Sequence, residues 1–549
     1  MHVSRCSPQG LRFSLRIAAC LTLIASVALA NHKDERLGFT IQTPNKWTAI
    51  PMSGDERWMV AKYLSDKSYF WEDKKEGWPR EHKPDMEVVA FVDAAVKEKA
   101  KLVKKEARNG RTEWFVGFES PFKDYKDFMT KRYSGGGWSI SDEKQDKVGD
   151  IPVTCYQIKV DKGSYEGPKH IITWVYHVPD VDIAVQFEAL EDAWPKLQAE
   201  FVRCLRSFKA TERSGEALYE TSTGSEKVAW VDEQKLTPEQ RKSHRAAVEK
   251  DTIDKATAKL TEGWTAKRMG HFFVLNHADE KFAKRVVDQG DAVWGWLDDT
   301  FGFVGEGEYV RSPILRICKD YPEYKAYFKG GNAWSRSEFE IVTYQDDGGS
   351  ESWMCKLVNG YVLDFWLVNR DRTITLSMPG WLGVGLSNLV QNLHVKNGKV
   401  TFRRDDWDRD EVREAARTGK TTDAKEIFVM SGEAYWQDYV KSQEAGQLVD
   451  FLAARGGAKD RRTKDLLPQY MRNLQAVIAE VTKEEEAAGG KVAKKPKTEE
   501  EEDAWFKETR QGMKKKEQRI LEDTFKRTFA DWKDSDWKAF EASYDKAVH

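Results

Sequence analysis

The spacing of apolar and polar residues divides the chain into a strand-rich first part and a helix-rich last part. Short runs rich in β-branched and aromatic residues predict strands, and they occur at residues 37–44, 86–92, 152–160, 171–177 and 183–189. Helical patterns occupy residues 93–106 and 201–208 between and after these runs. We therefore expect residues 36–210 to form an α+β sandwich.

The next part of the chain contains both strand patterns and helix patterns. Residues 211–236 are polar and predict a linker. Thr237 and Pro238 then predict a helix, with Thr237 as its cap and Pro238 in its first turn. The segment 237–424 also carries alternating strand and helix patterns, with strands at 271–276 and 313–318 and helices at 282–301 and 321–328. The pattern predicts a second α+β domain.

Residues 425–549 are predicted to be mostly helical. Apolar residues recur at helical spacing in 435–452, 466–481 and 505–548. A run of Glu, Lys, Ala and Gly at 484–503 interrupts this pattern, and we expect it to be a charged, solvated insertion. The whole chain is therefore assigned to the α+β class, with a helical C-terminal subdomain.

The N-terminus has the composition of an export signal. Three arginines precede an apolar run, Ile17 to Ala30, which ends in Ala-Leu-Ala. A basic region, an apolar region and a small-residue site predict a signal peptide cleaved after Ala30, and hence a periplasmic or extracellular protein. Lipidation at Cys20 is the alternative, although most of the apolar run follows Cys20 rather than preceding it.

Charge and composition narrow the classes of partner. The net charge of −2 provides no field that would attract nucleic acid or an anionic membrane. No segment after residue 30 offers 18 uninterrupted apolar residues, so we expect no membrane span after cleavage. The 21 tryptophans favour aromatic core packing, with a stacking groove for sugar or peptide as the alternative.

Four cysteines remain after signal cleavage: Cys155, Cys204, Cys318 and Cys355. An exported chain with four cysteines can form two disulfides. With the domain boundaries above, Cys155–Cys204 and Cys318–Cys355 are the pairings that stay within one domain. Buried free thiols are the competing interpretation.

Two short motifs in the first domain resemble those of PsbP/Mog1-like domains. They are G-F-T-I-Q-T-P-N-K-W at residues 38–47 and C-L-R-S-F-K at residues 204–209. The resemblance implies a binding or assembly module without catalysis.

The sequence M-P-G-W-L-G-V-G-L-S-N-L at residues 378–389 resembles the second half of the metal site in gluzincin-like (peptidase MA-like) zinc peptidases. In that family the pattern P-x-W-L-x-E-G-L-A carries the third zinc ligand. Here Trp381 is retained, but Val384 stands at the Glu position. The order of strands and helices over residues 265–548 is also similar to the family's order.

The H-E-x-x-H motif of that family is absent from the chain. In such peptidases two His bind zinc and the Glu between them is the general base. The family's spacing replaces the two His by Leu363 and Leu367, and the Glu by Asp364. No shift of register restores a His, because none occurs between His277 and His394. The resemblance thus implies a peptidase-type fold with a degenerate site, no catalysis and no cofactor.

Other residues could in principle rebuild a metal site. His394, Asp364 and either His271 or His277 are the candidates, since a catalytic zinc needs three protein ligands. The competing interpretation is that these are surface or strand-end histidines.

Asp364 lies in an apolar run, where an ionised carboxylate is costly unless it is paired. We expect it to cap a helix or to pair with Arg370 or Arg372, with a catalytic acid as the alternative.

The function that these patterns predict is an exported, non-catalytic, metallopeptidase-like protein that binds peptide or protein in a metal-free cleft. Two alternatives remain: a hydrolase with an unrecognised site, and a structural or assembly module of the cell envelope. The sequence leaves the oligomeric state open.

Overall fold

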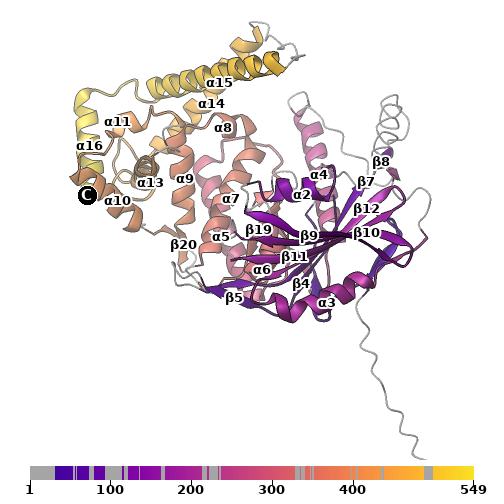
Figure 1. Ribbon diagram of the computed structural model, residues 1–549. Helices are drawn as coiled ribbons and strands as arrows, with labels where there is room; N and C mark the ends of the chain where they lie inside the picture. Colours follow the sequence, from indigo (N-terminus) through magenta and orange to yellow (C-terminus); the bar gives the residue numbers. More distant parts are fainter. Residues whose placement is uncertain are drawn as a thin grey trace, which may run out of the picture.

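The computed structural model describes residues 31–548 except 54–55, 57, 73–78, 93–113, 117–121, 135–136, 162–166, 213–218, 222–232, 234–235, 328–333, 336–339, 347, 349–351, 397–398, 404–405, 433–434, 436–437 and 488–498. Figure 1 shows a strand-rich N-terminal unit beside a helix-rich C-terminal unit, which confirms the α+β class. Within the described residues, no helix is long and apolar enough to cross a membrane. The predicted signal peptide at 1–30 and the helix predicted at 93–106 lie outside the described residues.

A seven-stranded antiparallel sheet forms the centre of the N-terminal unit, in the order β3-β4-β7-β12-β11-β10-β9. The strands predicted from the sequence at 86–92, 152–160, 171–177 and 183–189 all lie in it. The bounds are Trp47–Ala49 (β3), Met59–Ser65 (β4), Asp85–Val92 (β7), Trp138–Val148 (β9), Ile151–Val160 (β10), Lys169–Val178 (β11) and Val181–Leu190 (β12).

Each face of this sheet carries its own hydrophobic cluster, because successive strand residues point to opposite faces. One cluster contains Phe187 and Phe201, whose rings stack at 4.6 Å, and it is covered by α3 and a three-stranded sheet. The other lies under α2, where the Tyr125 hydroxyl is 2.6 Å from Thr173 Oγ1 and 2.7 Å from Gln186 Oε1. The covering elements are Asn31–Asp34 (β1), Phe39–Gln42 (β2), Lys209–Ala210 (β13), Tyr125–Arg132 (α2) and Trp194–Arg206 (α3).

Two sequence predictions for this region need correction. The closing helix begins at Trp194 rather than at residue 201, since Pro195 fits the first turn of a helix, and it ends at Arg206. The predicted linker 211–236 contains a short strand, Tyr219–Thr221 (β14), which pairs with Trp114–Val116 (β8). A separate hairpin is formed by Tyr69–Glu72 (β5) and Pro79–His82 (β6).

The second unit has a five-stranded sheet between two layers of helices. The strand order is β15-β16-β17-β19-β18, with β16, β17 and β19 parallel and both edge strands antiparallel. Leu315 and Ile317 of β17 share a cluster with the helices α5 and α7, while Cys318 packs with the helix α6 on the opposite face. The bounds are Thr265–Met269 (β15), Phe272–Asn276 (β16), Glu280–Phe301 (α5), Ile314–Cys318 (β17), Tyr321–Tyr327 (α6), Trp334–Ser335 (β18), Glu340–Tyr344 (β19) and Trp353–Arg370 (α7).

The helix predicted to begin at Thr237 is confirmed as α4, Pro238–Ala258. The Thr237 side chain accepts a hydrogen bond from the Gln240 amide, and the Gln240 side chain accepts one from the Thr237 amide. This reciprocal pair satisfies two backbone groups that a helix start leaves free.

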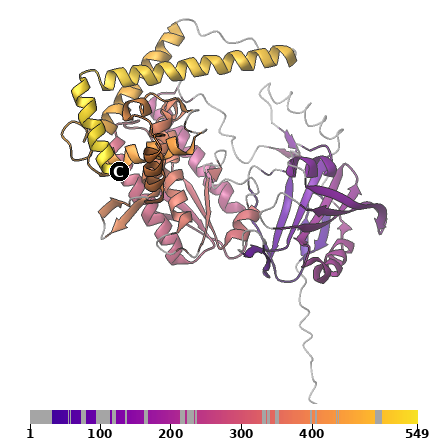
Figure 2. The same ribbon diagram turned by 60° about the vertical axis from the view of Figure 1, so that its left-hand side comes forward.

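The helical tail shares one hydrophobic cluster with the second sheet, since that cluster includes residues from Phe272 to Val548. The predicted insertion 484–503 is partly wrong, because α14 extends to Ala487 and α15 begins at Glu499. The remaining bounds are Arg372–Ser377 (α8), Gly380–Gln391 (α9), Leu393–Lys396 (β20), Lys399–Phe402 (β21), Asp406–Arg417 (α10), Ala424–Ile427 (α11), Tyr439–Ala454 (α13), Leu466–Ala487 (α14), Glu499–Thr528 (α15) and Asp534–Val548 (α16). Figure 2 shows α15 running along the top of the C-terminal unit.

The two units meet at α6. Ile50 and Leu64 of the first unit belong to the same buried cluster as Tyr324 and Tyr327 of α6. Beyond this cluster, Thr261 Oγ1 donates to the Ala49 carbonyl at 2.9 Å. The joint is therefore a desolvated contact between the β3–β4 end of the first sheet and the outer face of the second.

Candidate functional site

The region that the sequence identified as a degenerate metal site lies where α7 packs against α9. The Ser352 side chain caps α7 by accepting from the Cys355 amide at 3.1 Å, and Pro379 stands just before α9. Leu363 and Leu367 of α7 are 1% and 3% exposed, and Trp381 of α9 is fully buried. Val384 is half-buried and packs against the same cluster. A histidine pair at these leucines would have lain in this seam.

The register of the two helices brings the leucines toward Val384. Asn359 Nδ2 donates to the Val390 carbonyl at 3.2 Å, and a Cβ at Gly360 would lie 3.2 Å from Gln391 Nε2. The early part of α7 thus faces the late part of α9, so the helices run in opposite directions. The following turns of α7, with Leu363 and Leu367, therefore face the α9 turn that carries Val384.

Asp364 is exposed, and it sits in the middle of α7, so the prediction that it caps a helix is wrong. Its pairing with an arginine stays a prediction. Arg370 donates to Asp298 Oδ1 at 2.7 Å, and Trp366 Nε1 donates to the same oxygen at 2.9 Å. A helix turns by about 100° per residue, so neighbouring residues in the sequence point in different directions. Asp364 therefore faces solvent although the residues on either side of it are buried.

The glycines of the 378–389 motif have a packing role. A Cβ at Gly385 would lie 2.6 Å from the Ala445 carbonyl, and a Cβ at Gly446 would lie 2.7 Å from Asn388 Nδ2. α9 and α13 therefore approach too closely for larger residues at these positions. The ring of Trp381 packs edge-on against Tyr470 at 5.0 Å and closes the far side of α9.

The histidines proposed for a rebuilt metal site bind different partners. His271 Nδ1 is 2.8 Å from Asp291 Oδ1, and His277 Nδ1 is 2.7 Å from Glu323 Oε1. His271 precedes β16 and His277 follows it, so they are roughly 20 Å apart along the strand. His394 lies on β20, where its Nε2 is 3.3 Å from Arg403. Within the described ranges, no three His, Cys, Asp or Glu side chains meet as a metal site would require.

The four cysteines in the described part of the chain are buried free thiols. Neither Cys155–Cys204 nor Cys318–Cys355 is bonded in the structure. Burial raises the pKa of Cys155 and of Cys204 to about 11. Since the thiolate is the nucleophile, thiols in such surroundings are unreactive near neutral pH.

The residues that sequence reasoning missed lie at the joint between the two units. Lys62 of β4 is 3% exposed, and its Nζ donates to the Ala326 carbonyl at 2.9 Å and pairs with Glu56. Lys83 pairs with Asp320 at 2.6 Å, next to the start of α6. Lys62 thus binds the last turn of α6, where a cation is favoured by the helix dipole. A lysine inside the apolar run of β4 is the signal that could have indicated a buried partner.

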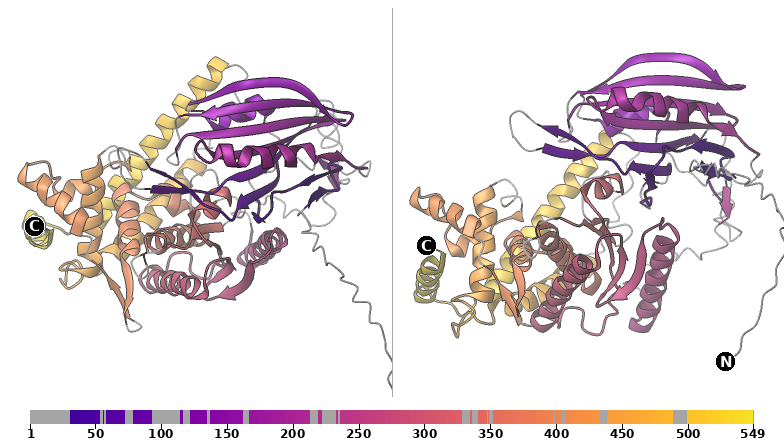
Figure 3. Two further views of the ribbon diagram at one scale, coloured as in Figure 1. Left: turned by 60° about the horizontal axis from the view of Figure 1, so that its bottom comes forward. Right: turned by 90° about the horizontal axis from the view of Figure 1, so that it is seen from below.

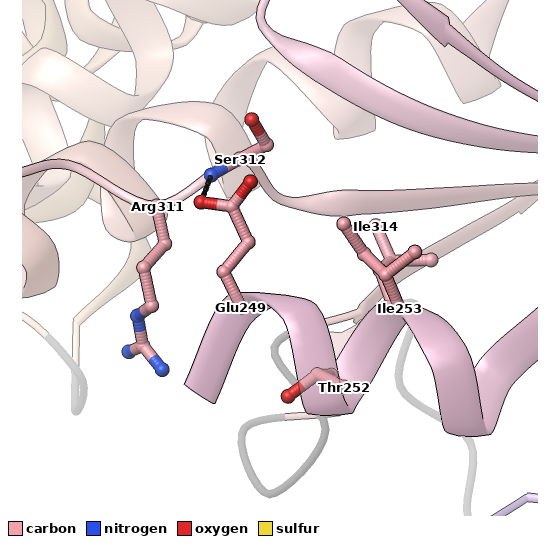
Figure 4. A pocket seen from close by; sticks show the side chains of 6 residues that line it. All are labelled: Glu249, Thr252, Ile253, Arg311, Ser312 and Ile314. Carbon is pink, nitrogen blue, oxygen red and sulfur yellow. Dashed lines mark hydrogen bonds between the residues drawn. The ribbon is translucent and has the colours of Figure 1, made fainter. Parts of the chain in front are cut away.

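A small cavity lies between α4 and the start of β17 (Figure 4). It holds about 10 Å³, which is room for a single water molecule. Glu249 on its wall accepts hydrogen bonds from Arg268, Tyr309 and the Ser312 amide at 2.6, 2.8 and 3.1 Å. The carboxylate is fully engaged and the space is far too small for a substrate, so this cavity is a packing defect under α4.

No family model matches the chain, and no curated protein matches it either. Several solved structures, among them the next three, are similar to parts of this chain. The cyanobacterial PsbP (CyanoP) of Synechocystis sp. PCC 6803 is 13% identical over 37% of this chain and 99% of its own, with a TM-score of 0.20. LpqN of Mycobacterium tuberculosis, described as involved in cell envelope biogenesis, is 11% identical over 33% of this chain and 88% of its own, with a TM-score of 0.20. A Bacteroides thetaiotaomicron VPI-5482 protein is 12% identical over 45% of this chain and 86% of its own, with a TM-score of 0.18.

At TM-scores of 0.20 and below, these likenesses carry no argument about function. A PsbP-like protein is among them, as the motifs at 38–47 and 204–209 led us to expect. A gluzincin is not among those reported above, and membership of that family stays a prediction.

Proposed function

We propose that this chain is an exported, non-catalytic binding protein whose metallopeptidase-like unit docks a peptide or protein without cleaving it. One observation carries the proposal: the two positions where the resemblance requires histidine are leucines buried in the α7–α9 seam. A zinc ion cannot bind to aliphatic side chains, and the carboxylate that replaces the general base, Asp364, is exposed on the surface.

The docking surface in this proposal is the solvent side of the same seam. Asp364 is exposed, while Val384, Ser387 and Gln391 of α9 are half-buried. Gln391 Nε2 donates to Ser387 Oγ at 3.0 Å, so polar groups that a peptide could engage lie beside an apolar one. Ligand sites commonly combine apolar walls with a few placed polar groups.

Binding and hydrolysis can be separated with a defined peptide pool. The mature protein, with zinc added, is incubated with random-sequence peptides, and equilibrium dialysis with mass spectrometry measures retention and cleavage. We expect retention of a subset of peptides without cleavage, and loss of that retention in Val384→Arg. Val400→Arg is the control, because Val400 is 38% exposed and lies on β21, outside α7 and α9.

Cleavage of the pool, or retention that is equal in both variants, would contradict the proposal. Thermal unfolding of each variant shows whether a loss of binding reflects a loss of fold.

No specific observation favours either of the two alternatives, the hydrolase or the assembly module. A hydrolase of another class would be favoured by titratable groups in a deep cleft, whereas the cavity under α4 has room for one water molecule. An assembly module would be favoured by a large apolar patch on the first unit. In the described part of that unit, Phe70 is the one large hydrophobic side chain that is strongly exposed.

A further inference from the structure

The strand β9 is an open edge of the seven-stranded sheet. It stands last in the strand order, and within the described residues it pairs with β10 alone. All its side chains from Ser141 to Lys147 are exposed. An edge strand presents a row of unpaired backbone N–H and C=O groups that can pair with another strand. β9 is 11 residues long, which is more than most strands.

Two irregularities limit the part of β9 that can pair. Ser141 is an extra residue opposite β10, because Gln157 pairs with Asp142 and Ile158 pairs with Ile140. At the other end the strand stops at Val148 and turns at Gly149, whose φ is +60°. A β-bulge bends a strand and interrupts its ladder. The regular segment is therefore Asp142–Val148, and Gln145 is its central residue.

The charges of this segment are arranged about the same residue. The sequence from 143 to 147 is Glu-Lys-Gln-Asp-Lys. If an identical segment runs antiparallel about Gln145, Glu143 lies opposite Lys147 of the second copy and Lys144 lies opposite its Asp146. The four charged positions from 143 to 147 then each meet an opposite charge, Gln145 meets Gln145, and Asp142 meets Val148. Opposite charges across strands stabilise a pair, and like charges destabilise it.

We propose that β9 is the contact through which two copies of this chain form a two-fold symmetric dimer, with one sheet running through both. The centre of the regular segment and the centre of the charge pattern are defined by independent observations, yet they coincide at Gln145. A symmetric contact of this kind uses the same surface on both copies, so it closes at two and does not propagate.

In the described part of the chain, the joint between the two units lies far from β9. The α6 joint lies at the β3–β4 end of the sheet, the end opposite β9. In both views of Figure 3 the long strands of the first sheet lie at the top, on the side away from the five-stranded sheet. Glu143 is 2.9 Å from Lys126 of α2, so it already helps to hold α2 on the sheet.

Charge on an edge strand often serves to prevent pairing, and this is the competing interpretation. Protected edges carry charged side chains, inward-pointing charges or β-bulges, and β9 has both charges and the bulge at Ser141. Residues 143–147, however, carry two acidic and two basic side chains and no net charge. Such an edge repels a strand of uniform charge but accepts its own antiparallel copy.

The test uses charge reversal with rescue in mixtures. Lys144→Glu and Asp146→Lys each put two like-charged pairs into the self-contact, and an equimolar mixture restores opposite charges across a heterodimer. Sedimentation velocity of the mature full chain, up to about 100 µM in low salt, measures association. Lys159→Glu, an exposed lysine on β10, is the control with the same charge change.

We expect the unaltered chain and Lys159→Glu to form dimers. Each single reversal should weaken the dimer by about tenfold or more, and mixing the two should recover it. An unaltered chain that stays monomeric over the whole range would overturn the proposal. So would reversals that associate normally, or a mixture that stays monomeric while both variants keep the circular dichroism spectrum of the unaltered chain.

Discussion

Two helices, α4 and α6, cover the same face of the five-stranded sheet, and they are held there by different forces. α6 is anchored by a buried apolar cluster and by two lysines of the first unit, Lys62 and Lys83. α4 has a single buried residue, and that residue is the charged Glu249. A helix in a globular protein normally faces the core with an apolar stripe, and α4 lacks one.

The side chains through which α4 contacts the rest of the protein are mainly charged. Arg241 donates to Glu308 at 2.9 Å, and Arg245 donates to Glu233 at 2.8 Å and to the Asn369 carbonyl at 3.0 Å. Ion pairs near the surface contribute little individually, whereas breaking a buried pair is costly. The comparison indicates that α6 fixes the two units together, while α4 is attached weakly enough to open first.

The largest effect should follow from removing the lysine that holds the end of α6. Lys62→Met leaves Glu56 without its partner and frees the carbonyls of Ala326 and Tyr327, and we expect a loss of about 3 kcal/mol in unfolding free energy. Calorimetry should show one transition splitting into two as the units separate. Lys67→Met, an exposed lysine just beyond the same strand, is the control. An unfolding curve equal to the control's would mean that α6 is not the anchor.

The next effect concerns α4 alone. Glu249→Gln weakens the hydrogen bonds to Arg268 and Tyr309, and we expect a loss of about 1.5 kcal/mol that is local to α4. Hydrogen exchange with mass spectrometry should show lower protection in α4 and unchanged protection in α6. Asp254→Asn removes an exposed α4 carboxylate and should change neither. Equal loss in both helices would remove the distinction between them.

Acid should release α4 before α6. Burial raises the pKa of Glu249, but hydrogen bonds from Arg268, Tyr309 and the Ser312 amide outweigh it and hold that pKa below its ordinary value of 4.5. A depressed pKa contributes stability above the ordinary value, and this stability is lost as the pH falls through the lowered one. Protection of α4 should therefore be constant from about pH 7 to pH 5 and decrease below it. In Glu249→Gln this decrease should disappear, and a decrease that persists would assign it to another group.

The smallest effect is that of salt. At 1 M salt the screening length is about 3 Å, so partly exposed arginine pairs weaken while buried contacts hardly change. We expect exchange in α4 to become faster by about twofold to fivefold between 0.05 and 1 M salt. The rates in α6 should stay the same. Parallel changes in the two helices would show that the α4 pairs are not what holds it.

Local patterns predicted much of this fold. Elements that depend on neighbouring residues are found where the pattern predicted them. They are the strands β10, β11 and β12, the cap of α4 and the amphipathic helix α5. Gly385 is required by the close approach of α13, which comes some sixty residues later in the chain. For this reason the motif at 378–389 suggested a former metal site, whereas the structure shows a packing role for its glycine.

Burial was harder to predict than secondary structure. Lys62 is buried because Ala326 and Tyr327 come to it from the other unit, which no local pattern contains. Asp364 lies in an apolar run, but the rotation of α7 turns it toward solvent. The burial of Lys62 and of Asp364 therefore depends on which face of β4 or α7 packs against residues far away in the sequence.

The central claim is the proposal that the unit formed by residues 237–424 holds no catalytic metal, and a zinc measurement tests it most directly. The protein without residues 1–30 and without tags is dialysed against trace zinc, and the bound metal is measured by elemental analysis. The buried leucines at positions 363 and 367 predict a stoichiometry near zero. One zinc per chain that survives dialysis would contradict the claim, and substitution of His271, His277 and His394 would then locate the site.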